Sequence, residues 1–282
     1  MTDLQSRNRI QEVMVRAAAH AKREESYRQG GFEFICRAGH ILESACRHDV
    51  NAAFEETACM RCLYQSELRL PELPEMVFPR NALTIKFRGG TIELNALDAL
   101  KMVCPDKLPD VKVGPSTVWQ SARQERLKMI TEQHQPFDWT YTTHYKGTVA
   151  GCTVEATEEK IDMERLKRRD QIMFHSSVTL FEDELADHGI AQLSARIRVM
   201  DAGYFFVLLR FYMRVDNVLL RVCDTRIVGD DNSNFVIREW QLREAKYEQL
   251  KHVFPDDLLD IDRAWMHLPV IQSTCEKITA NS

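Results

Sequence analysis

The chain has 282 residues and a formal net charge of −5, and 44% of its residues are hydrophobic. This is the composition of an ordinary soluble globular protein, so the disordered, collagen-like and disulfide-scaffold classes are excluded. The acidic balance argues against a nucleic-acid-binding domain, which is usually basic, and the longest hydrophobic run, 204–209, is far shorter than the roughly 20 residues of a membrane helix.

The N-terminal segment is rich in helix formers over 3–28 and shows no strand-like period. Gly30 and Gly31 follow this segment, and glycine commonly ends a helix. We therefore predict an N-terminal helical extension over residues 1–31 and a domain over residues 32–282. The start of the chain is polar and shows no signal sequence.

The first part of the domain predicts a strand, a helix and a hairpin in turn. Apolar and polar residues alternate over 32–36, which predicts a strand, and helical spacing predicts a helix over 49–62. The strongest signal is a hairpin over 83–94, where two alternating runs flank a glycine pair that tolerates the positive φ of a tight turn. Asn95 is then predicted to cap a short helix over 96–101.

The rest of the chain is rich in strand signals. A helix is predicted over 116–131, and aromatic residues and threonines on both faces of 138–147 favour a strand. The later predicted elements are strands over 193–199, 204–215, 218–228 and 235–240, and a last helix over 241–252. Short connections make neighbouring strands antiparallel. The predicted fold class is α+β: a single domain on a mostly antiparallel β-sheet core with flanking helices.

Cysteines raise the question of a metal site. Cys59 and Cys62 have the short spacing of a zinc-binding pair, with Cys46 or His48 upstream. A structural zinc site needs four ligands, usually from two such pairs, and no second pair follows. On a helix the two thiols would share a face and pack as small apolar side chains. We therefore favour free thiols without a metal, and the eight irregularly spaced cysteines indicate a reducing, cytoplasmic location.

A dense polar cluster lies over 181–189. Asp183, Asp187 and His188 could ligate a divalent metal or act as general acid and base, which would make the protein a metal-dependent hydrolase. A solvated helical turn that ends at Gly189 explains the same residues. The sequence contains no phosphate-loop, dinucleotide-binding, α/β-hydrolase or zincin motif. We therefore favour a protein that is not an enzyme and needs no cofactor.

Arginines on the predicted strands form the most unusual pattern. They are Arg196, Arg198, Arg210, Arg214, Arg221 and Arg226. Period-two spacing aligns side chains on one face of a strand, and the planar guanidinium suits carboxylates. Two explanations stay open. The arginines pair internally with Asp216, Asp224 and Glu239, or they line a groove that receives an acidic peptide or a C-terminal carboxylate.

Seven short motifs, in order along the chain, are more specific. They are Leu73-Pro-Glu-Met-Val-Phe78, Glu93-Leu-Asn-Ala-Leu-Asp-Ala-Leu100, Phe137-Asp-Trp-Thr-Tyr-Thr-Thr-His-Tyr-Lys-Gly-Thr148, Leu180-Phe-Glu-Asp-Glu-Leu-Ala-Asp-His-Gly189, Ile197-Arg-Val-Met200, Leu208-Leu-Arg-Phe211 and Cys223-Asp-Thr-Arg226. This set resembles the TIPRL family of TOR-signalling regulators. The resemblance covers about residues 70–280.

The resemblance implies a non-enzymatic protein that binds the catalytic subunits of type 2A protein phosphatases. It implies that the protein modulates their activity and assembly downstream of the TOR kinase. It also implies a compact α+β domain with a cleft that receives the phosphatase's C-terminal tail. A pure scaffold, which binds the phosphatase without changing its activity, stays open as an alternative.

Family binding positions carry over to Asp98, Ile161, Val222 and Asp224, as implied by the resemblance. The full set of candidate partner-binding residues is Asp98, Ile161, Val222, Asp224, Arg221, Arg226, Arg196, Arg198 and Arg210. We expect charge reversal of Asp224 or Arg221 to weaken phosphatase capture and to leave the fold intact. Neither nucleic acid nor membrane is an expected partner.

Overall fold

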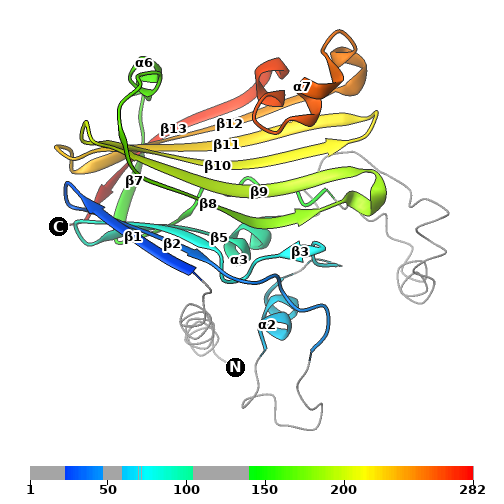
Figure 1. Ribbon diagram of the computed structural model, residues 1–282, viewed down its shortest axis with the longest axis horizontal. Helices are drawn as coiled ribbons and strands as arrows, with labels where there is room; N and C mark the ends of the chain where they lie inside the picture. Colours follow the sequence, from blue (N-terminus) through cyan, green and yellow to red (C-terminus); the bar gives the residue numbers. More distant parts are fainter. Residues whose placement is uncertain (1–22, 47–58, 69, 71, 104–139, 282) are drawn as a thin grey trace.

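The computed structural model describes residues 23–46, 59–68, 70, 72–103 and 140–281. Within them, two antiparallel sheets lie face to face (Figure 1). The large sheet has the strand order β3-β8-β9-β10-β11-β12-β13-β7, and the small sheet has the order β1-β2-β4-β5-β6. The few helices are short, so the fold class is α+β, as predicted.

The bounds of the elements are as follows. The strands of the small sheet are β1 Arg23–Gln29, β2 Phe32–Ala38, β4 Ala82–Phe87, β5 Gly90–Asn95 and β6 Thr148–Ala150. Those of the large sheet are β3 Met76–Val77, β7 Cys152–Ala156, β8 Ile172–Asp183, β9 Gly189–Met200, β10 Tyr204–Val215, β11 Leu219–Asp230, β12 Phe235–Lys246 and β13 Val270–Ala280. The helices are α2 Met60–Glu67, α3 Ala96–Lys101, α6 Met163–Leu166 and α7 Pro255–Leu259, and the 3-10 helices are η2 Leu185–Asp187, η3 Tyr247–Leu250 and η4 Ala264–His267.

The main hydrophobic core lies between the two sheets. We call the side of the large sheet that is turned toward the small sheet its inner face, and the opposite side its outer face. Phe205 of β10 meets Phe32 and Phe34 of β2 edge-on, with ring centroids 4.9 and 4.8 Å apart. Each fully buried side chain of this size contributes about 1.5–3 kcal/mol of hydrophobic stabilisation. This core holds the large sheet rigid.

A second, smaller core lies on the outer face. It forms where residues 247–268, which we call the C-terminal lobe, fold back over β10 and β11 (Figure 1). Leu258 and Leu268 of the lobe pack in one cluster with Tyr212 and Val222 of the strands. The Tyr212 hydroxyl donates to the Leu258 carbonyl oxygen at 2.7 Å, which satisfies a buried polar group.

Local signals predicted several elements correctly. The hairpin over 83–94 is β4 and β5, and Gly89 at its turn has a φ of 88°. Asn95 caps α3, because its Oδ1 accepts the backbone N–H of Asp98 at 2.8 Å. The strands predicted over 32–36, 193–199, 204–215 and 218–228 are β2, β9, β10 and β11.

The helix predicted over 3–28 is wrong for its last part. Residues Arg23–Gln29 form strand β1, which pairs antiparallel with β2. Tyr27 stacks on Phe174 of β8 with ring centroids 5.6 Å apart, a tertiary contact that outweighs helix propensity. Gly30 and Gly31 have positive φ and make the turn of this hairpin rather than a helix end. The boundary expected between residues 31 and 32 therefore falls within one hairpin, at the end of its turn. Residues 1–22 lie outside the described part.

The strand predicted over 138–147 is also wrong within 140–147, where the backbone joins no ladder. Tyr141 has a φ of 49°, which interrupts an extended backbone. The segment instead bridges the two sheets: the Tyr145 hydroxyl donates to the Glu93 carbonyl oxygen of β5 at 2.8 Å, and Thr225 Oγ1 of β11 donates to the Tyr145 carbonyl oxygen at 3.4 Å. Side chains on both faces of the segment are largely buried, so both faces make contacts within the fold.

The helix predicted over 241–252 is a third error. Strand β12 runs on to Lys246 because it pairs with β11 along its length and with β13 as far as Arg243. The 3-10 helix η3 follows over Tyr247–Leu250. Pro255, expected after the helix, instead occupies the first turn of α7, where its missing N–H costs nothing.

Two further predicted helices are only partly testable. Of the helix predicted over 49–62, the described part begins at Met60 with Cys59 as its N-cap. The helix predicted over 116–131 lies outside the described residues. Among the described residues, no helix combines the length and the hydrophobicity needed to cross a membrane.

Candidate partner-binding surface

Strand alternation gathers arginines on the outer face of the large sheet. Arg196 and Arg198 lie on β9, Arg210 on β10, Arg226 on β11 and Arg243 on β12. We call these five residues, together with Asp224 on β11, the arginine face. Its members lie on adjacent strands, because β9, β10, β11 and β12 are neighbours in the sheet.

A buried ion pair forms the centre of the arginine face. Arg210 donates from Nε and Nη2 to the two carboxylate oxygens of Asp224, both at 2.7 Å. Arg226 Nη2 donates to the same carboxylate at 3.3 Å. Asp224 is 2% exposed and Arg210 is 5% exposed. A bidentate, desolvated pair of this kind fixes geometry, and its disruption leaves a charge buried without a partner.

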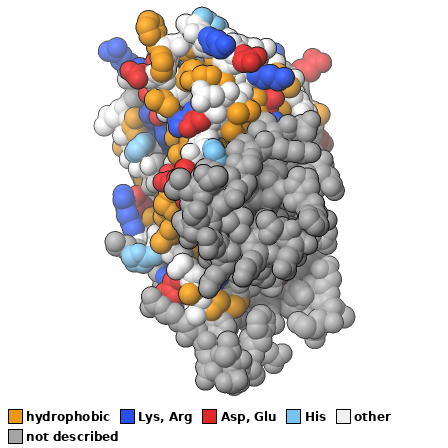
Figure 2. Space-filling view, turned by 90° about the vertical axis from the view of Figure 1, so that its right-hand side faces the viewer, with side chains coloured by type: hydrophobic (Ala, Val, Ile, Leu, Met, Phe, Trp, Pro, Cys, Tyr) orange, Lys and Arg blue, Asp and Glu red, His pale blue; other side chains and the backbone are white. Residues whose placement is uncertain are grey.

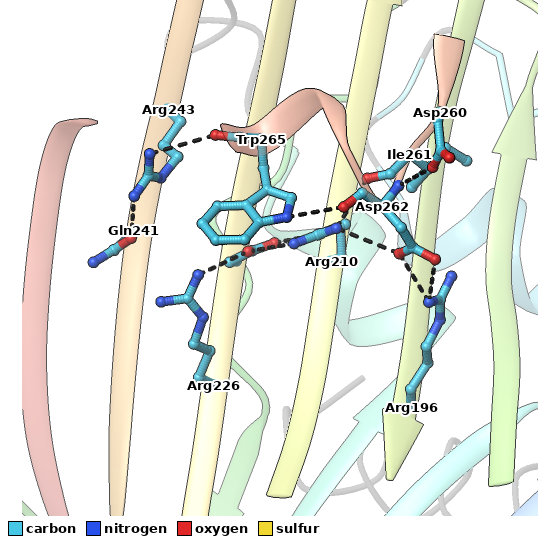
Figure 3. A network of polar contacts seen from close by, with 10 residues as sticks. Arg196, Arg210, Arg226, Gln241, Arg243, Asp260, Ile261, Asp262 and Trp265 are labelled. Atoms are coloured by element: carbon cyan, nitrogen blue, oxygen red, sulfur yellow. Dashed lines mark hydrogen bonds and ion pairs between the residues drawn. The ribbon is translucent and has the colours of Figure 1, made fainter. Parts of the chain in front are cut away.

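The C-terminal lobe adds a second carboxylate and an indole (Figure 3). Asp262 accepts from Arg196 Nη1 at 2.8 and 2.7 Å and lies 3.4 Å from Arg210 Nη1. Arg210 Nη1 also donates to the Ile261 carbonyl oxygen at 2.9 Å. Trp265 Nε1 donates to the Asp262 carbonyl oxygen at 3.0 Å, so the indole is held in place.

Three guanidinium groups surround the Trp265 ring. The guanidinium carbons of Arg210, Arg226 and Arg243 lie 5.7, 5.4 and 5.1 Å from its centroid, within the range of cation–π attraction. Arg243 donates to the carbonyl oxygens of Trp265 and Leu268. Among the described residues, no carboxylate lies within ion-pairing distance of Arg243. Burial and the nearby Arg226 cation lower the pKa of Arg243 below its ordinary value.

Two more predicted residues belong to the outer face. Ile161 is 6% exposed, and its N–H donates to Glu239 Oε1 of β12 at 2.7 Å. Val222 is fully buried beneath the C-terminal lobe. Arg198 is exposed on β9. The structure therefore brings most of the predicted residues to one face of the sheet, although Ile161 and Val222 are buried there.

Arg221 and Asp98 lie elsewhere. Arg221 is five residues before Arg226, an odd spacing that turns it to the inner face, where it donates to Glu244 Oε2 at 2.7 Å and to Thr142 Oγ1 at 3.1 Å. Asp98 lies in the first turn of α3, beside the small sheet, and accepts from Thr148 Oγ1 at 2.5 Å. Their roles in binding stay predictions.

Internal pairing, one of the two open explanations, accounts for part of the arginines. Arg214 pairs with Asp216, and Asp224 holds Arg210 and Arg226, as that explanation expected. The burial of Asp224 does not support the expectation that its charge reversal leaves the fold intact. Arginines that share a carboxylate, however, can still donate hydrogen bonds to a ligand.

Sequence reasoning missed Arg243, Asp262 and Trp265. Arg243 was missed because 241–252 was interpreted as a helix. Had the strand period been continued past Trp240, Arg243 would have fallen on the same face as Arg226. The lobe residues carry no periodic signal, since only the fold of 247–268 brings them over the sheet.

The polar cluster over 181–189 contains the expected helical turn, η2, with Glu184 and Asp187 exposed, but Asp183 differs from the expectation. Asp183 is buried rather than solvated and accepts the backbone N–H groups of Glu75 at 3.0 Å and Leu185 at 2.7 Å. Burial raises its pKa to about 7 against the effect of these hydrogen bonds. Among the described residues, the metal-ligating side chains that converge are Cys46, Cys59 and Cys62, and Asp183, Asp187 and His188 form no such group.

Comparison with known proteins gives a consistent picture. Residues 76–251 match the TIP41-like family. A TIP41-like protein of Caenorhabditis elegans is 67% identical over 279 residues, which are 99% of this chain and 98% of that protein. A TIP41-like protein of Homo sapiens is 43% identical over 217 residues, 75% of this chain and 79% of its own length.

A more distant relative carries a functional name. The type 2A phosphatase activator TIP41 of Saccharomyces cerevisiae is 36% identical over 234 residues, 73% of this chain and 65% of its own length. The match to the family spans most of the large sheet, including the arginine face. The chain therefore belongs to the TIP41-like family, in agreement with the resemblance of its seven motifs.

Proposed function

We propose that this protein regulates type 2A protein phosphatases in the cytoplasm, downstream of the TOR kinase, and does so by binding the phosphatase catalytic subunit without catalysing a reaction itself. The name of the yeast relative, a type 2A phosphatase activator, supports the phosphatase as partner. The arginine face supports binding of an acidic segment of that partner, namely the C-terminal tail of the catalytic subunit.

The excess of positive charge around Trp265 carries this proposal. Arg196, Arg210 and Arg226 share the carboxylates of Asp224 and Asp262. Arg243 adds a fourth cation without adding a carboxylate. Four guanidinium groups thus accompany two carboxylates, and the buried strands beneath hold them in place. Charge-assisted hydrogen bonds to a partner's carboxylates are the interaction that such a surface favours.

Arg226 and Arg243 are the proposed contacts for the tail. Arg210 is committed to Asp224 by two short hydrogen bonds, whereas Arg226 makes one longer bond to it. An extended peptide along the sheet would place alternate side chains toward this face and would fill the expected cleft. Val222 and Asp224 then contribute to binding indirectly. Val222 packs against the lobe, and Asp224 holds the arginines in position.

The C-terminal lobe offers a contact for the body of the catalytic subunit. Its exposed hydrophobic side chains are Phe254, Leu259 and Met266, which are 78%, 53% and 57% exposed. Figure 2 shows hydrophobic side chains interspersed with both signs of charge at this end of the molecule. Large exposed hydrophobic side chains next to a charged surface are typical of protein interfaces.

A binding assay with the full chain tests the proposal. The purified protein is titrated with a type 2A catalytic subunit, with and without a synthetic peptide that copies the subunit's C-terminal tail. We expect the peptide to compete and Arg243→Gln or Arg226→Gln to weaken binding by about tenfold or more, because each removes a hydrogen bond between charged groups. Arg28→Gln is the matched control, since Arg28 is an exposed arginine of β1 paired with Glu33.

Two results would contradict parts of the proposal. If the Arg243→Gln, Arg226→Gln and Arg28→Gln variants bound the catalytic subunit with equal affinity, the arginine face would not be part of the interface. Phosphatase activity that does not change at saturating protein would identify a scaffold rather than a regulator. The same activity, measured in cytosol from cells with and without a TOR inhibitor, tests the position downstream of the kinase.

A further inference from the structure

Three thiols lie together at the N-terminal end of α2. Figure 1 shows that this helix lies on the side of the small sheet, away from β10 and β11 of the large sheet. Cys59 is the N-cap of the helix and Cys62 lies in its first turn, while Cys46 comes from the segment that follows β2. The Sγ atom of Cys46 lies 3.3 Å from that of Cys62 and 3.5 Å from that of Cys59. All three sulfur atoms lie within 4.8 Å of one another.

This spacing fits a tetrahedral metal ion. Zinc–sulfur bonds of about 2.3 Å place two ligands of a tetrahedral ion about 3.8 Å apart. The observed sulfur distances of 3.3 and 3.5 Å lie close to that value. They are well beyond the roughly 2.05 Å of a disulfide bond. The three thiols are half-buried or exposed, so they do not form the apolar helix face that the sequence suggested.

Hydrogen bonds of the surrounding segments hold the thiols in this arrangement. The N–H of Cys62 donates to Cys59 Sγ at 3.3 Å, which fixes the pair at the start of the helix. Arg61 Nη1 donates to the Glu43 carbonyl oxygen at 3.1 Å and so joins the two segments. Leu42 N–H donates to the Val77 carbonyl oxygen at 2.7 Å, which anchors the segment before Cys46 to β3.

We propose that Cys46, Cys59 and Cys62 bind one Zn²⁺ ion as three thiolates. Binding releases three thiol protons to solvent and leaves a complex of net charge −1, with the fourth coordination position open to water or another ligand. Soft thiolate ligands select zinc over magnesium or calcium. The ion would join the segment after β2 to the start of α2, at a site separate from the arginine face.

Cobalt provides the direct test, because Co²⁺ bound to thiolates is coloured and Zn²⁺ is not. The full chain is reduced, freed of metal by a chelator and titrated with Co²⁺ alone, and then with Zn²⁺. We expect a thiolate-to-cobalt charge-transfer band that saturates at one ion per chain and disappears when Zn²⁺ displaces the cobalt. Metal analysis of the untreated protein, purified without added metal, should give about one zinc per chain.

Variants locate the site. Cys46→Ser, Cys59→Ser and Cys62→Ser should each lose most of the band, whereas Cys275→Ser, which removes a half-buried thiol of β13, should retain it. The stoichiometry in the unaltered chain keeps the proposal testable even if a variant fails to fold. Absence of the band in the unaltered, reduced chain, or its persistence in the Cys46 and Cys62 variants, would overturn the proposal.

Discussion

The two faces of the large sheet use arginine in opposite ways. On the inner face, Arg221 donates to Glu244, and Arg238 donates to Glu276, which also pairs with Lys146. Among the described residues, neither carboxylate is shared between two arginines. On the outer face, guanidinium groups outnumber the carboxylates that they contact around Trp265. The two faces therefore differ in how arginines share carboxylates and not in burial, because Arg226 and Arg221 are each 8% exposed. We propose that the arginines that share a carboxylate also bind a ligand.

The difference follows from what covers each face. The inner face is covered by the small sheet and by residues 140–147, which bring hydroxyl and carbonyl groups to the arginines, such as the Lys146 carbonyl oxygen bonded to Arg238. The outer face is covered in part by the C-terminal lobe, which contributes one carboxylate, Asp262, and one indole, Trp265. Four predictions test this comparison.

Removal of Asp224 should have the largest effect. Asp224→Ala leaves Arg210 buried without its carboxylate, and loss of one partner of a buried pair costs about 3–5 kcal/mol. Urea unfolding followed by circular dichroism measures the free energy of unfolding. Asp216→Ala is the control, because the Arg214–Asp216 pair is partly exposed and should contribute less than about 1 kcal/mol. Equal effects of the two substitutions would show that the outer network is not a stabilising centre.

Asp183 offers a contrast to Asp224. It is also a buried carboxylate, but it accepts backbone N–H groups, whereas Asp224 accepts from arginines. Its pKa is about 7 in the folded protein and 3.8 when unperturbed, so between these values the folded state binds more protons than the unfolded state. The free energy of unfolding should therefore fall as pH rises from about 4 to about 7, by roughly 2–4 kcal/mol.

Urea unfolding across this pH range measures the effect of Asp183. In Asp183→Asn the fall should be largely absent, because residue 183 no longer titrates. Asp216→Asn serves as the control and should keep the pH dependence of the unaltered chain. The same slope in Asp183→Asn and in the unaltered chain would assign the dependence to other groups.

Arg221→Gln tests the inner face. Glu244 is partly exposed and can be rehydrated, so the loss of their hydrogen bonds should cost about 1–2 kcal/mol of stability. The sequence led us to expect that a change at Arg221 weakens binding of the type 2A catalytic subunit. Because Arg221 lies on the inner face with Glu244 and Thr142, we now expect binding to stay unchanged, in contrast to Arg243→Gln. If Arg221→Gln weakened binding as much as Arg243→Gln while the protein remained folded, the proposed division between the two faces would be wrong.

The smallest effect on stability is expected at the lobe surface. Phe254 is 78% exposed, so Phe254→Ser should change the free energy of unfolding by less than about 0.5 kcal/mol. Its affinity for the catalytic subunit should nevertheless fall severalfold. Val154→Ser on β7 is the control, because Val154 is also exposed and hydrophobic. Equal affinities of the two variants would confine the interface to the arginine face.

Sequence reasoning succeeded where one local pattern was sufficient. Alternation identified β9, a nearly continuous apolar run identified β10, and a short turn before 218–228 identified β11. These strands carry Arg196, Arg210 and Arg226, and a single residue, Asn95, marked the start of α3. The seven motifs indicated the family to which the chain belongs. These features depend on neighbouring residues only, so they can be recognised without knowledge of the rest of the chain.

Tertiary structure alone decided the remaining features. Residues 23–28 and 241–246 became strands because an adjacent strand supplied hydrogen bonds, and residues 140–147 joined no ladder because both sheets bonded their side chains. Trp265 met three arginines, and Cys46 met Cys59 and Cys62, only after distant segments came together. Sequence by itself determined β9, β10 and β11 and their arginines. The assembled sheets decided which arginines share a carboxylate, because pairing between distant residues leaves no periodic pattern in the sequence.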